Sequence, residues 1–277
     1  MNLKPLRLPS LLKDFGISPK KSLGQNFLVD EGYLQKIVRV SGVDQDTEVL
    51  EIGAGAGNLT RYLAHSAHRV VAVEIDNALF PLLKKTTASY NNVHLVKGDI
   101  LDQDLSALMR HHGYAVVANI PYYITSALIR FLLENTLKPS CLVLTIQREV
   151  ARRVCAQAGA LSMLALSVQL YGTPHIALRV PAGAFYPVPG VDSALLIIDL
   201  YEQPRIPAAL IDDFFMLAKA GFSQKRKMLR NTLASAPGMD KDRAVKLLLQ
   251  VGIDPKRRAQ TLTLDEWKRL TAAYQMV

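Results

Sequence analysis

The stretch EVLEIGAGAG, residues 48–57, joins an apolar segment typical of a buried strand to a turn with three alternating glycines. A helical pattern follows near residues 58–66, and the apolar, β-branched segment RVVAVEI spans residues 69–75. A strand, a glycine-rich turn and a helix form the nucleotide-binding unit of doubly wound folds, where the ligand lies at the carboxyl edge of the sheet. The sequence therefore predicts a Rossmann-like domain with its ligand site at this turn.

Strand-like and helical patterns continue to alternate beyond this unit. Further strand-like segments occupy residues 94–100, 114–120, 141–146 and 194–200. Most are apolar along their whole length, as expected where helices cover both faces of a parallel sheet. The predicted fold class is therefore α/β.

The chain changes character after Tyr201. Two prolines in EQPRIP break the pattern, and residues 208–277 are helical, basic and poor in strand signals. We therefore expect an α/β domain over residues 1–201, which includes a basic N-terminal segment, and a small all-helical domain over residues 202–277.

The net charge of +9 is concentrated at the two ends of the 277-residue chain. Residues 1–40 hold 7 basic and 3 acidic side chains, and residues 201–277 hold 14 and 8. Residues 41–140 hold 8 and 10. This distribution suits a core that binds a small molecule, with ends that bind a polyanion. Solvated lysine-rich helices are the alternative explanation.

The composition disfavours several kinds of site and location. Cys141 and Cys155 have no CxxC spacing, and the six histidines form no ligand pattern, so we expect reduced thiols and no metal. No segment approaches the roughly 20 apolar residues of a membrane span, and the N-terminus lacks an apolar signal core. These features predict a cytoplasmic protein without membrane contact. Because heptad repeats are absent, we expect a monomer.

The spacing of the glycines indicates which nucleotide is bound. Gly53, Gly55 and Gly57 follow Glu51 as E-x-G-x-G-x-G, which differs from the G-x-G-x-x-G of dinucleotide-binding folds. The arrangement resembles the motif of methyltransferases and favours S-adenosylmethionine over NAD.

Polar side chains stand at the ends of the next three strands. Glu74 lies about 20 residues after the first glycine, where an acid can hold two ribose hydroxyls. The alternative is that Glu74 is only a surface acid at the end of its strand. Asp99 is placed to accept from the adenine amino group of the cofactor, and Ile100 to contact its ring. Ile75 completes this predicted cofactor site. With Asn119 at the end of the following strand, these positions define one cleft.

The sequence Asn119-Ile120-Pro121-Tyr122 has the chemistry required for methylation of an adenine amino group. This amine is a poor nucleophile because its lone pair is delocalised into the ring. The Asn119 side-chain oxygen and a backbone carbonyl beside Pro121 can accept hydrogen bonds from the two N–H groups of this amine, which frees its lone pair for the methyl donor. Tyr122 can stack on the base. An ordinary turn after a strand is the alternative, since Asn and Pro are common turn residues.

Six ordered motifs then resemble one family. They are KKSLGQNFLVD (20–30), EIGAGAGNLT (51–60), NIPYYIT (119–125), FYPVPGVDS (185–193), FSQKRKMLRNTL (222–233) and GIDPKRRAQTLTLDEW (252–267). Together they resemble the ribosomal RNA adenine dimethyltransferases of the KsgA type. The resemblance implies a class I S-adenosylmethionine methyltransferase domain with a helical C-terminal domain. It also implies N6-dimethylation of two adjacent adenosines near the 3′ end of 16S rRNA, during small-subunit biogenesis.

The resemblance assigns roles to particular residues. Those implied to contact S-adenosylmethionine or the target amine are Asn26, Leu28, Gly53, Glu74, Asp99 and Asn119. Tyr122 would stack on the target adenine, and Phe185 would close its other side unless it is an ordinary core aromatic. The basic residues expected to contact phosphates of the small-subunit rRNA are Lys20, Lys21, Lys225, Arg226, Lys227, Arg230, Lys256, Arg257 and Arg258.

The chain departs from the family pattern at two places. Tyr123 stands where Asn is frequent, and Pro187-Val188-Pro189-Gly190 replaces a Pro-Pro-Pro-Lys run. The missing lysine removes one phosphate contact from the expected RNA grip.

Three other functions share part of this pattern. Erm-type enzymes carry the same cofactor motifs but methylate one adenine of large-subunit rRNA, and DNA adenine methyltransferases share the N-x-P-Y chemistry. A non-catalytic ribosome-assembly factor could keep the fold. The C-terminal motifs favour the small-subunit enzyme, and the intact Glu74, Asp99 and Asn119 favour catalysis.

Overall fold

The structure, a computed structural model, describes residues 3–275 apart from the side chain of Tyr122, and it divides into two compact units. The sheet unit comprises the described residues up to Ala151 together with His175–Leu200. The helical unit comprises Arg152–Pro174 and the described residues from Tyr201 onward. Among the described residues, no helix combines the length and apolar character needed to cross a membrane.

The division differs from the expected domains in one segment. The chain passes from the sheet unit to the helical unit for the last time between residues 200 and 201, one residue from the predicted boundary at 201/202. Residues 152–174, however, also belong to the helical unit. Long-range backbone hydrogen bonds hold this segment there: Gly159 donates to Gln260 at 2.8 Å, and Arg205 donates to Leu170 at 2.9 Å. Local patterns could not reveal these pairings, because the partners lie far apart in the sequence.

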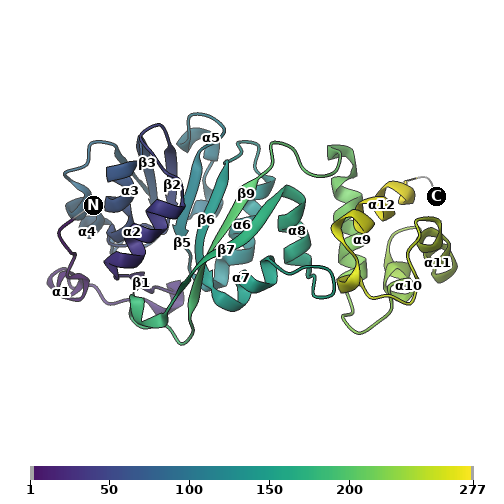
Figure 1. Ribbon diagram of the computed structural model, residues 1–277. Helices are drawn as coiled ribbons and strands as arrows, with labels where there is room; N and C mark the ends of the chain where they lie inside the picture. Colours follow the sequence, from purple (N-terminus) through teal and green to yellow (C-terminus); the bar gives the residue numbers. More distant parts are fainter. Residues whose placement is uncertain (1–2, 276–277) are drawn as a thin grey trace. The chain divides into compact units, whose positions relative to one another are not determined.

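A seven-stranded sheet forms the centre of the sheet unit, with strand order β4-β3-β2-β5-β6-β9-β7 (Figure 1). Its strands are β2 (Glu48–Ile52), β3 (Arg69–Glu74), β4 (Val93–Lys97), β5 (Ala115–Asn119), β6 (Cys141–Gln147), β7 (Gly172–Val180) and β9 (Ser193–Leu200). The pairs from β4 to β6 are parallel, and β9 pairs antiparallel with β6. The predicted α/β fold is confirmed, and the sheet is parallel from β4 to β6 but mixed as a whole because β9 is antiparallel.

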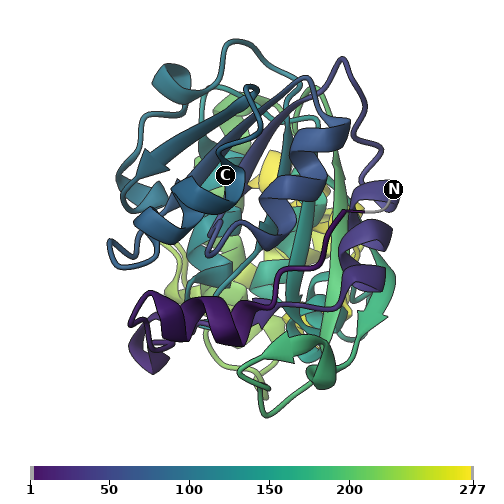
Figure 2. The same cartoon turned by 90° about the vertical axis from the view of Figure 1, so that its left-hand side faces the viewer.

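Alternate side chains of the strands form a core with the neighbouring helices. The α-helices within residues 8–154 are α1 (Leu8–Asp14), α2 (Glu31–Val40), α3 (Asn58–Ser66), α4 (Phe80–Thr87), α5 (Leu105–Leu108), α6 (Thr125–Glu134) and α7 (Arg148–Val154). Val49 of β2, Val117 of β5 and Val143 of β6 pack with side chains of α2 and α3. Figure 2 shows helices from the first part of the chain, coloured purple to blue, in front of the sheet. The intervening residues, such as Leu50 and Val116, are buried as well. This two-sided burial explains the continuous apolar pattern of the central strands.

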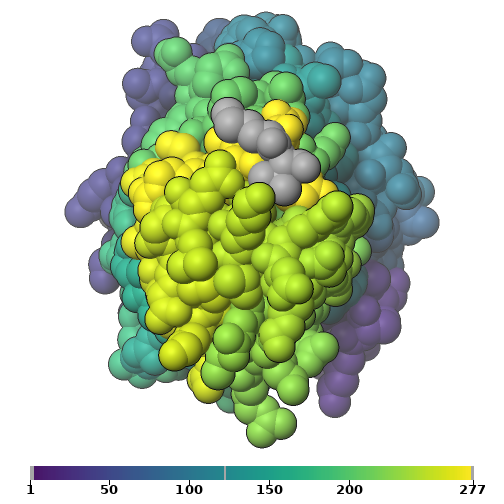
Figure 3. Space-filling view, turned by 90° about the vertical axis from the view of Figure 1, so that its right-hand side faces the viewer, coloured from purple at the N-terminus to yellow at the C-terminus, as the bar shows by residue number. Residues whose placement is uncertain are grey.

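The helical unit packs around Trp267. Its helices are α8 (Met163–Tyr171), α9 (Ile211–Phe222), α10 (Leu229–Thr232), α11 (Lys241–Gln250) and α12 (Leu264–Tyr274). Figure 3 shows one face of this unit, where the residues from α10 to α12 are coloured yellow-green to yellow. Trp267 of α12 is fully buried and stacks on Phe222 of α9 with ring centroids 5.7 Å apart. A Cβ at Gly221 would lie 2.5 Å from the Trp267 ring, so only glycine allows this close approach of α9 and α12.

We therefore expect Gly221→Ala to lower the free energy of unfolding by about 1–3 kcal/mol, the usual cost of overpacking a core. The measurement is urea unfolding followed by fluorescence of Trp267, the single tryptophan. Gly183→Ala is the control, because a Cβ there meets nothing within 4 Å and the backbone is not left-handed. Equal unfolding midpoints for the two variants would contradict the packing argument.

Candidate active site

The glycine turn after β2 has a backbone that favours glycine at each alternate position. Gly53, Gly55 and Gly57 have φ values of 76°, 61° and 83°, in the left-handed region. A Cβ at Gly55 would also lie 3.0 Å from the ring of Phe27. The Gly53 and Ala54 amides donate to the Val73 carbonyl at 2.9 and 3.1 Å, which attaches the turn to β3.

A cleft opens beside this turn. It is partly open to solvent. Its lining residues are Leu23, Gly24, Gln25, Asn26, Phe27, Gly53, Gly55, Glu74, Ile75, Leu79, Asn119, Ile120 and Pro121. The ends of β2, β3 and β5 therefore meet at one cleft, whereas the end of β4, which the pattern of strand ends also placed there, does not line it.

Glu74, at the end of β3, connects its strand to the glycine turn. One carboxylate oxygen accepts from the Gly55 amide at 2.6 Å, and the other accepts from the Asp76 amide at 2.7 Å. Burial raises the pKa of the Glu74 carboxyl, although these hydrogen bonds oppose the effect. Each carboxylate oxygen has a second lone pair, so the side chain retains capacity to accept from a ligand hydroxyl.

A second acid, Glu51, lies deeper in β2 and had no assigned role. It is 1% exposed, and its Oε2 atom has no hydrogen-bond partner among the described residues. Burial, together with the nearby charge of Glu74, raises the pKa of Glu51 to about 8. The side chain is therefore mostly protonated at neutral pH.

Asn119, at the end of β5, is oriented by a segment from the N-terminal part of the chain. Its Nδ2 atom donates to the backbone carbonyl of Asn26 at 2.8 Å. A carbonyl can only accept, so this contact fixes which end of the amide is the nitrogen. The Oδ1 atom is consequently left as an acceptor at the cleft that Asn119 lines.

Some predicted site residues do not line the cleft. Leu28 and Phe185 are cross-strand neighbours in the pair of β1 (Phe27–Leu28) with β8 (Phe185–Tyr186), and both are only 3% exposed in the core. Phe185 therefore occupies the position of a core aromatic, and its contact with a target base stays a prediction. The side chain of Tyr122 lies outside the described part of the chain.

Asp99 and Ile100 follow β4, next to β3 in the sheet, but do not line the cleft either. The Asp99 carboxylate accepts from the Leu101 amide at 3.0 Å, and Ile100 is buried. Their contacts with the cofactor stay predictions.

Lys20 differs from the prediction of a phosphate contact. Its Nζ atom lies 2.7 Å from a carboxylate oxygen of Asp76 in an ion pair within the sheet unit. Lys21 is exposed and makes no ion pair among the described residues. Of these two lysines, only Lys21 has an ammonium group available for a phosphate without breaking an internal ion pair.

The basic residues of the helical unit fall into two groups. Lys225, Arg226 and Lys227, which precede α10, and Lys256 and Arg258, which precede α12, are exposed. Arg230 of α10 is half-buried. Backbone hydrogen bonds from Leu229 to Arg257 at 2.7 Å and from Arg230 to Pro255 at 3.3 Å hold the two basic segments together. These segments therefore form one basic surface.

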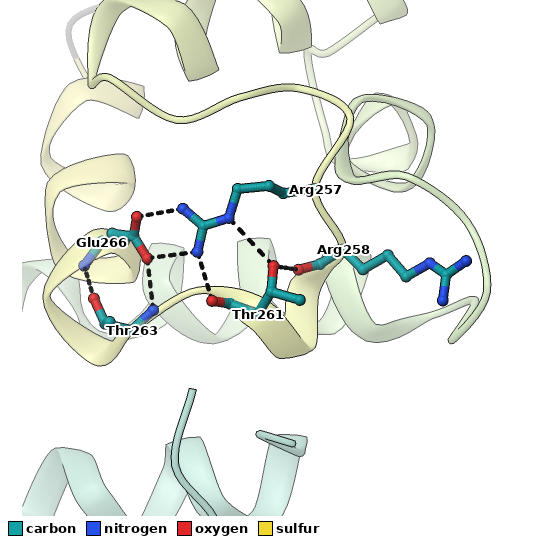
Figure 4. Close-up of polar contacts among 5 residues, drawn as sticks. All are labelled: Arg257, Arg258, Thr261, Thr263 and Glu266. Atoms are coloured by element: carbon teal, nitrogen blue, oxygen red, sulfur yellow. Dashed lines mark hydrogen bonds and ion pairs between the residues drawn. The ribbon is translucent and has the colours of Figure 1, made fainter. Parts of the chain in front are cut away.

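Arg257 supports this surface from within (Figure 4). Its guanidinium donates to the Glu266 carboxylate at 2.5 and 3.0 Å, and to the backbone carbonyl of Thr261 at 2.5 Å. The hydrogen bonds from Arg257 to Glu266 are the largest cause of the lowered pKa of Glu266. With most of its donors used internally, Arg257 orders the loop that carries Lys256 and Arg258. Its contact with a phosphate stays a prediction.

Sequence reasoning missed several residues of the cleft. They are Leu23, Gly24, Gln25, Phe27, Leu79 and Ile120. Most belong to the KKSLGQNFLVD segment, in which only Lys20, Lys21, Asn26 and Leu28 were assigned roles. The available signal was the unusual cluster of Gly24, Gln25 and Asn26 directly before a strand.

The strand order, the antiparallel β9 and a glycine turn bonded to the acid at the end of the next strand define a class I S-adenosylmethionine-dependent methyltransferase. The family model for ribosomal RNA adenine dimethylases matches residues 16–275, and the chain belongs to that family.

Curated relatives agree with this assignment. The ribosomal RNA small subunit methyltransferase A of Dehalococcoides mccartyi (strain BAV1) is 40% identical over 95% of this chain and 91% of the relative. Its counterpart in Moorella thermoacetica is also 40% identical, over 98% of both chains.

Solved structures show the same fold. A dimethyladenosine transferase from Plasmodium falciparum has a TM-score of 0.76 at 26% identity, covering 89% of this chain and 96% of that one. The 23S rRNA methyltransferase ErmE has a TM-score of 0.73 at 26% identity, covering 90% and 100%.

The raised pKa of Glu51 predicts a pH dependence of stability. The folded protein holds a proton on Glu51 that the unfolded chain releases near pH 4.5, so stability falls as pH rises from there to about 8 and then levels off. Each pKa unit corresponds to about 1.4 kcal/mol, which gives a loss of several kcal/mol. Glu51→Gln mimics the protonated form and should lack this loss. Urea unfolding at pH 6 and pH 8.5 checks it, and parallel pH profiles for the two proteins would rule it out.

Proposed function

We propose that this protein transfers methyl groups from S-adenosylmethionine to N6 of two adjacent adenosines near the 3′ end of small-subunit rRNA, two to each. The observation that carries the proposal is the orientation of Asn119. Its amide nitrogen is held by the Asn26 carbonyl at 2.8 Å, and its oxygen is left as an acceptor at the cleft. A fixed acceptor at this position is what an amine of low nucleophilicity requires.

The residues of the chain act by orientation and by hydrogen bonding. The Asn119 oxygen and a backbone carbonyl beside Pro121 accept from the two N–H groups of the target amine and direct its lone pair into the cleft. After the first transfer one N–H remains, and Asn119 orients it again. No general base is needed, because the catalytic effect comes from positioning and from fixed dipoles.

The cleft fits the cofactor that the family implies. S-adenosylmethionine supplies an electrophilic methyl group when bound. Glu74 offers acceptor capacity for ribose hydroxyls, Ile75 and Leu79 offer apolar surface for the adenine, and the left-handed Gly53 and Gly55 leave room beside the backbone. We also assign Asn26, Leu28, Asp99 and Ile100 to cofactor binding, as the motifs imply.

The target adenosine must leave its stack to reach the cleft, which costs least in a loop. We propose that Tyr122 stacks on the base and that Phe185 lies on its other side. The basic surface of Lys225, Arg226, Lys227, Lys256 and Arg258, with Arg230 and Lys21, would hold rRNA phosphates without selecting bases. We expect the enzyme to act as a monomer in the cytoplasm.

A large-subunit rRNA methyltransferase is the second candidate, favoured by the similarity to ErmE over 90% of this chain. The relatives at 40% identity bear the small-subunit name, and this supports the first candidate. The test is transfer of labelled methyl to unmethylated small subunits, large subunits and duplex DNA, followed by nucleoside analysis. N6,N6-dimethyladenosine in small-subunit RNA alone is expected. Label in large subunits would favour the second candidate.

Asn119→Ala and Asn119→Asp should each reduce transfer of both methyl groups by about 100-fold or more, the usual effect of removing one fixed dipole. Asp keeps an acceptor oxygen but replaces the Nδ2 donor with a second oxygen, which the Asn26 carbonyl repels. The Asp variant therefore tests the orientation of the side chain rather than the presence of the oxygen alone. Single-turnover assays with separate quantification of mono- and dimethyladenosine measure this. The exposed Asn91→Ala is the control. Near-normal turnover of Asn119→Ala would disprove the role of Asn119.

Charge reversal at Lys225, Arg226 and Lys227 should weaken binding to small subunits and reduce its salt dependence. Each lost phosphate contact lowers the slope of log K against log salt by roughly 0.7–0.9, so a change of about 2 to 3 is expected. Filter binding between 50 and 300 mM KCl measures the slope. A variant reversed at Lys219, Lys241 and Lys246 has the same net charge and controls for general repulsion. Equal slopes in the two variants would contradict the assignment.

A further inference from the structure

One wall of the cleft is a strap, residues 20–28, that comes from a different part of the chain than the strand ends. Leu23 to Phe27 line the cleft together with residues of the glycine turn, β3 and β5. The strap contains only the single turn Lys21–Leu23 and the two-residue strand β1. Such a short segment has few hydrogen bonds of its own, so its position depends on the points where it is attached.

The first attachment is Asp76, which follows β3. This side chain is 2% exposed, and it accepts from Lys20 Nζ at one oxygen and from Gln25 Nε2 at the other, both at 2.7 Å. The Ala78 amide donates to it at 3.0 Å. Burial opposes ionisation, but the hydrogen bonds from Lys20, Gln25 and Ala78 outweigh it and lower the pKa of Asp76.

The strap is shaped so that both donors reach Asp76 together. The Lys20 amide donates to Gln25 Oε1 at 2.7 Å, and the Gln25 amide donates to the Lys20 carbonyl at 3.3 Å. Gly24 is left-handed, and a Cβ there would lie 3.2 Å from the Pro121 side chain and 3.4 Å from the Tyr123 ring. Residues 20–25 therefore form a closed loop packed against the N-x-P-Y motif.

The same strap orients Asn119. One residue beyond Gln25, the Asn26 carbonyl accepts from the Asn119 amide at 2.8 Å. Phe27 and Leu28 then pair with β8, and the Val29 amide donates to the Ala184 carbonyl at 2.9 Å. On its other side, the Asp76 amide donates to Glu74 at 2.7 Å. Asp76 thus links the acid at the end of β3 to the segment that orients the asparagine at the end of β5.

We propose that Asp76 is a positioning residue, which holds the strap through Lys20 and Gln25 so that the cleft is complete and Asn119 correctly oriented before RNA binds. The inference rests on the proposed function, because it concerns the same cleft. A buried carboxylate needs its charged partner, so removal of the Lys20 ammonium leaves Asp76 uncompensated and frees the end of the strap. Lys20 therefore supports cofactor binding indirectly, through Asp76, whereas its neighbour Lys21 makes no bond to Asp76 and has no such effect.

The decisive experiment compares Lys20→Ala with Lys21→Ala, two adjacent exposed lysines of which only the first is bonded to Asp76. Binding of S-adenosylhomocysteine, with no RNA present, is measured by calorimetry. We expect Lys20→Ala to raise Kd by about ten- to a hundredfold, the effect of one charged hydrogen bond, and Lys21→Ala to match wild type. Hydrogen exchange of amides 20–28 in the ligand-free protein should accelerate only in Lys20→Ala.

Asp76→Asn is the second variant, and Gln25→Ala the third. Each should weaken cofactor binding, and Lys20→Ala should add little in the Asp76→Asn background, because both changes break the same attachment. Equal Kd values for Lys20→Ala and Lys21→Ala, with wild type binding normally, would overturn the role of Asp76 and leave the proposed function intact. Failure of the wild-type protein to bind the ligand would instead overturn the proposed function.

Discussion

The hydrogen bond from the Gly55 amide to the Glu74 carboxylate is the interaction around which the site is organised. It spans 2.6 Å and joins the glycine turn after β2 to the end of β3. It needs a left-handed residue without a side chain at position 55, because a Cβ would meet the Phe27 ring. It also needs a parallel register of β2 with β3 that brings the two ends level. The cleft exists because both conditions are met at the carboxyl edge of the sheet.

The remaining walls are attached to this centre by polar contacts between distant parts of the chain. Glu74 accepts from the Asp76 amide, Asp76 accepts from Lys20 and Gln25, and the Asn26 carbonyl accepts from Asn119. Each contact uses a donor or acceptor that would otherwise be available to a ligand. The orientation of Asn119 shows the result: its nitrogen is occupied and its oxygen is left as an acceptor at the cleft, where we propose that the target amine binds. A site for a neutral amine can be prepared in this way without a titrating base.

The helical unit uses charge in two ways. Arg257 is bonded to Glu266 and Thr261 and orders a loop, whereas Lys256 and Arg258 on either side of it are exposed. A run of three basic residues therefore contains one structural cation and two that are free to meet phosphates. A guanidinium is suited to the first role, because its fixed fork of donors can bind a carboxylate and a carbonyl together.

The sequence by itself determined the fold class, the glycine turn and the strand ends that meet at the cleft. Those features depend on local periodicity and on residues such as Gly55, whose backbone conformation few other residues adopt. Glu74 and Asn119 could be identified for the same reason, since each is the last residue of a predicted strand. The family motifs extended the prediction to the basic ends of the chain, which we propose bind RNA.

Only the tertiary structure decided which polar groups are already paired. Lys20 and Lys21 are identical in type, yet Asp76, which bonds to one of them, lies 56 positions along the chain. The burial of Phe185, the internal role of Arg257 and the membership of residues 152–174 in the helical unit have the same origin. Each follows from contacts between segments far apart in sequence, and periodicity carries no information about which distant partner a side chain will meet.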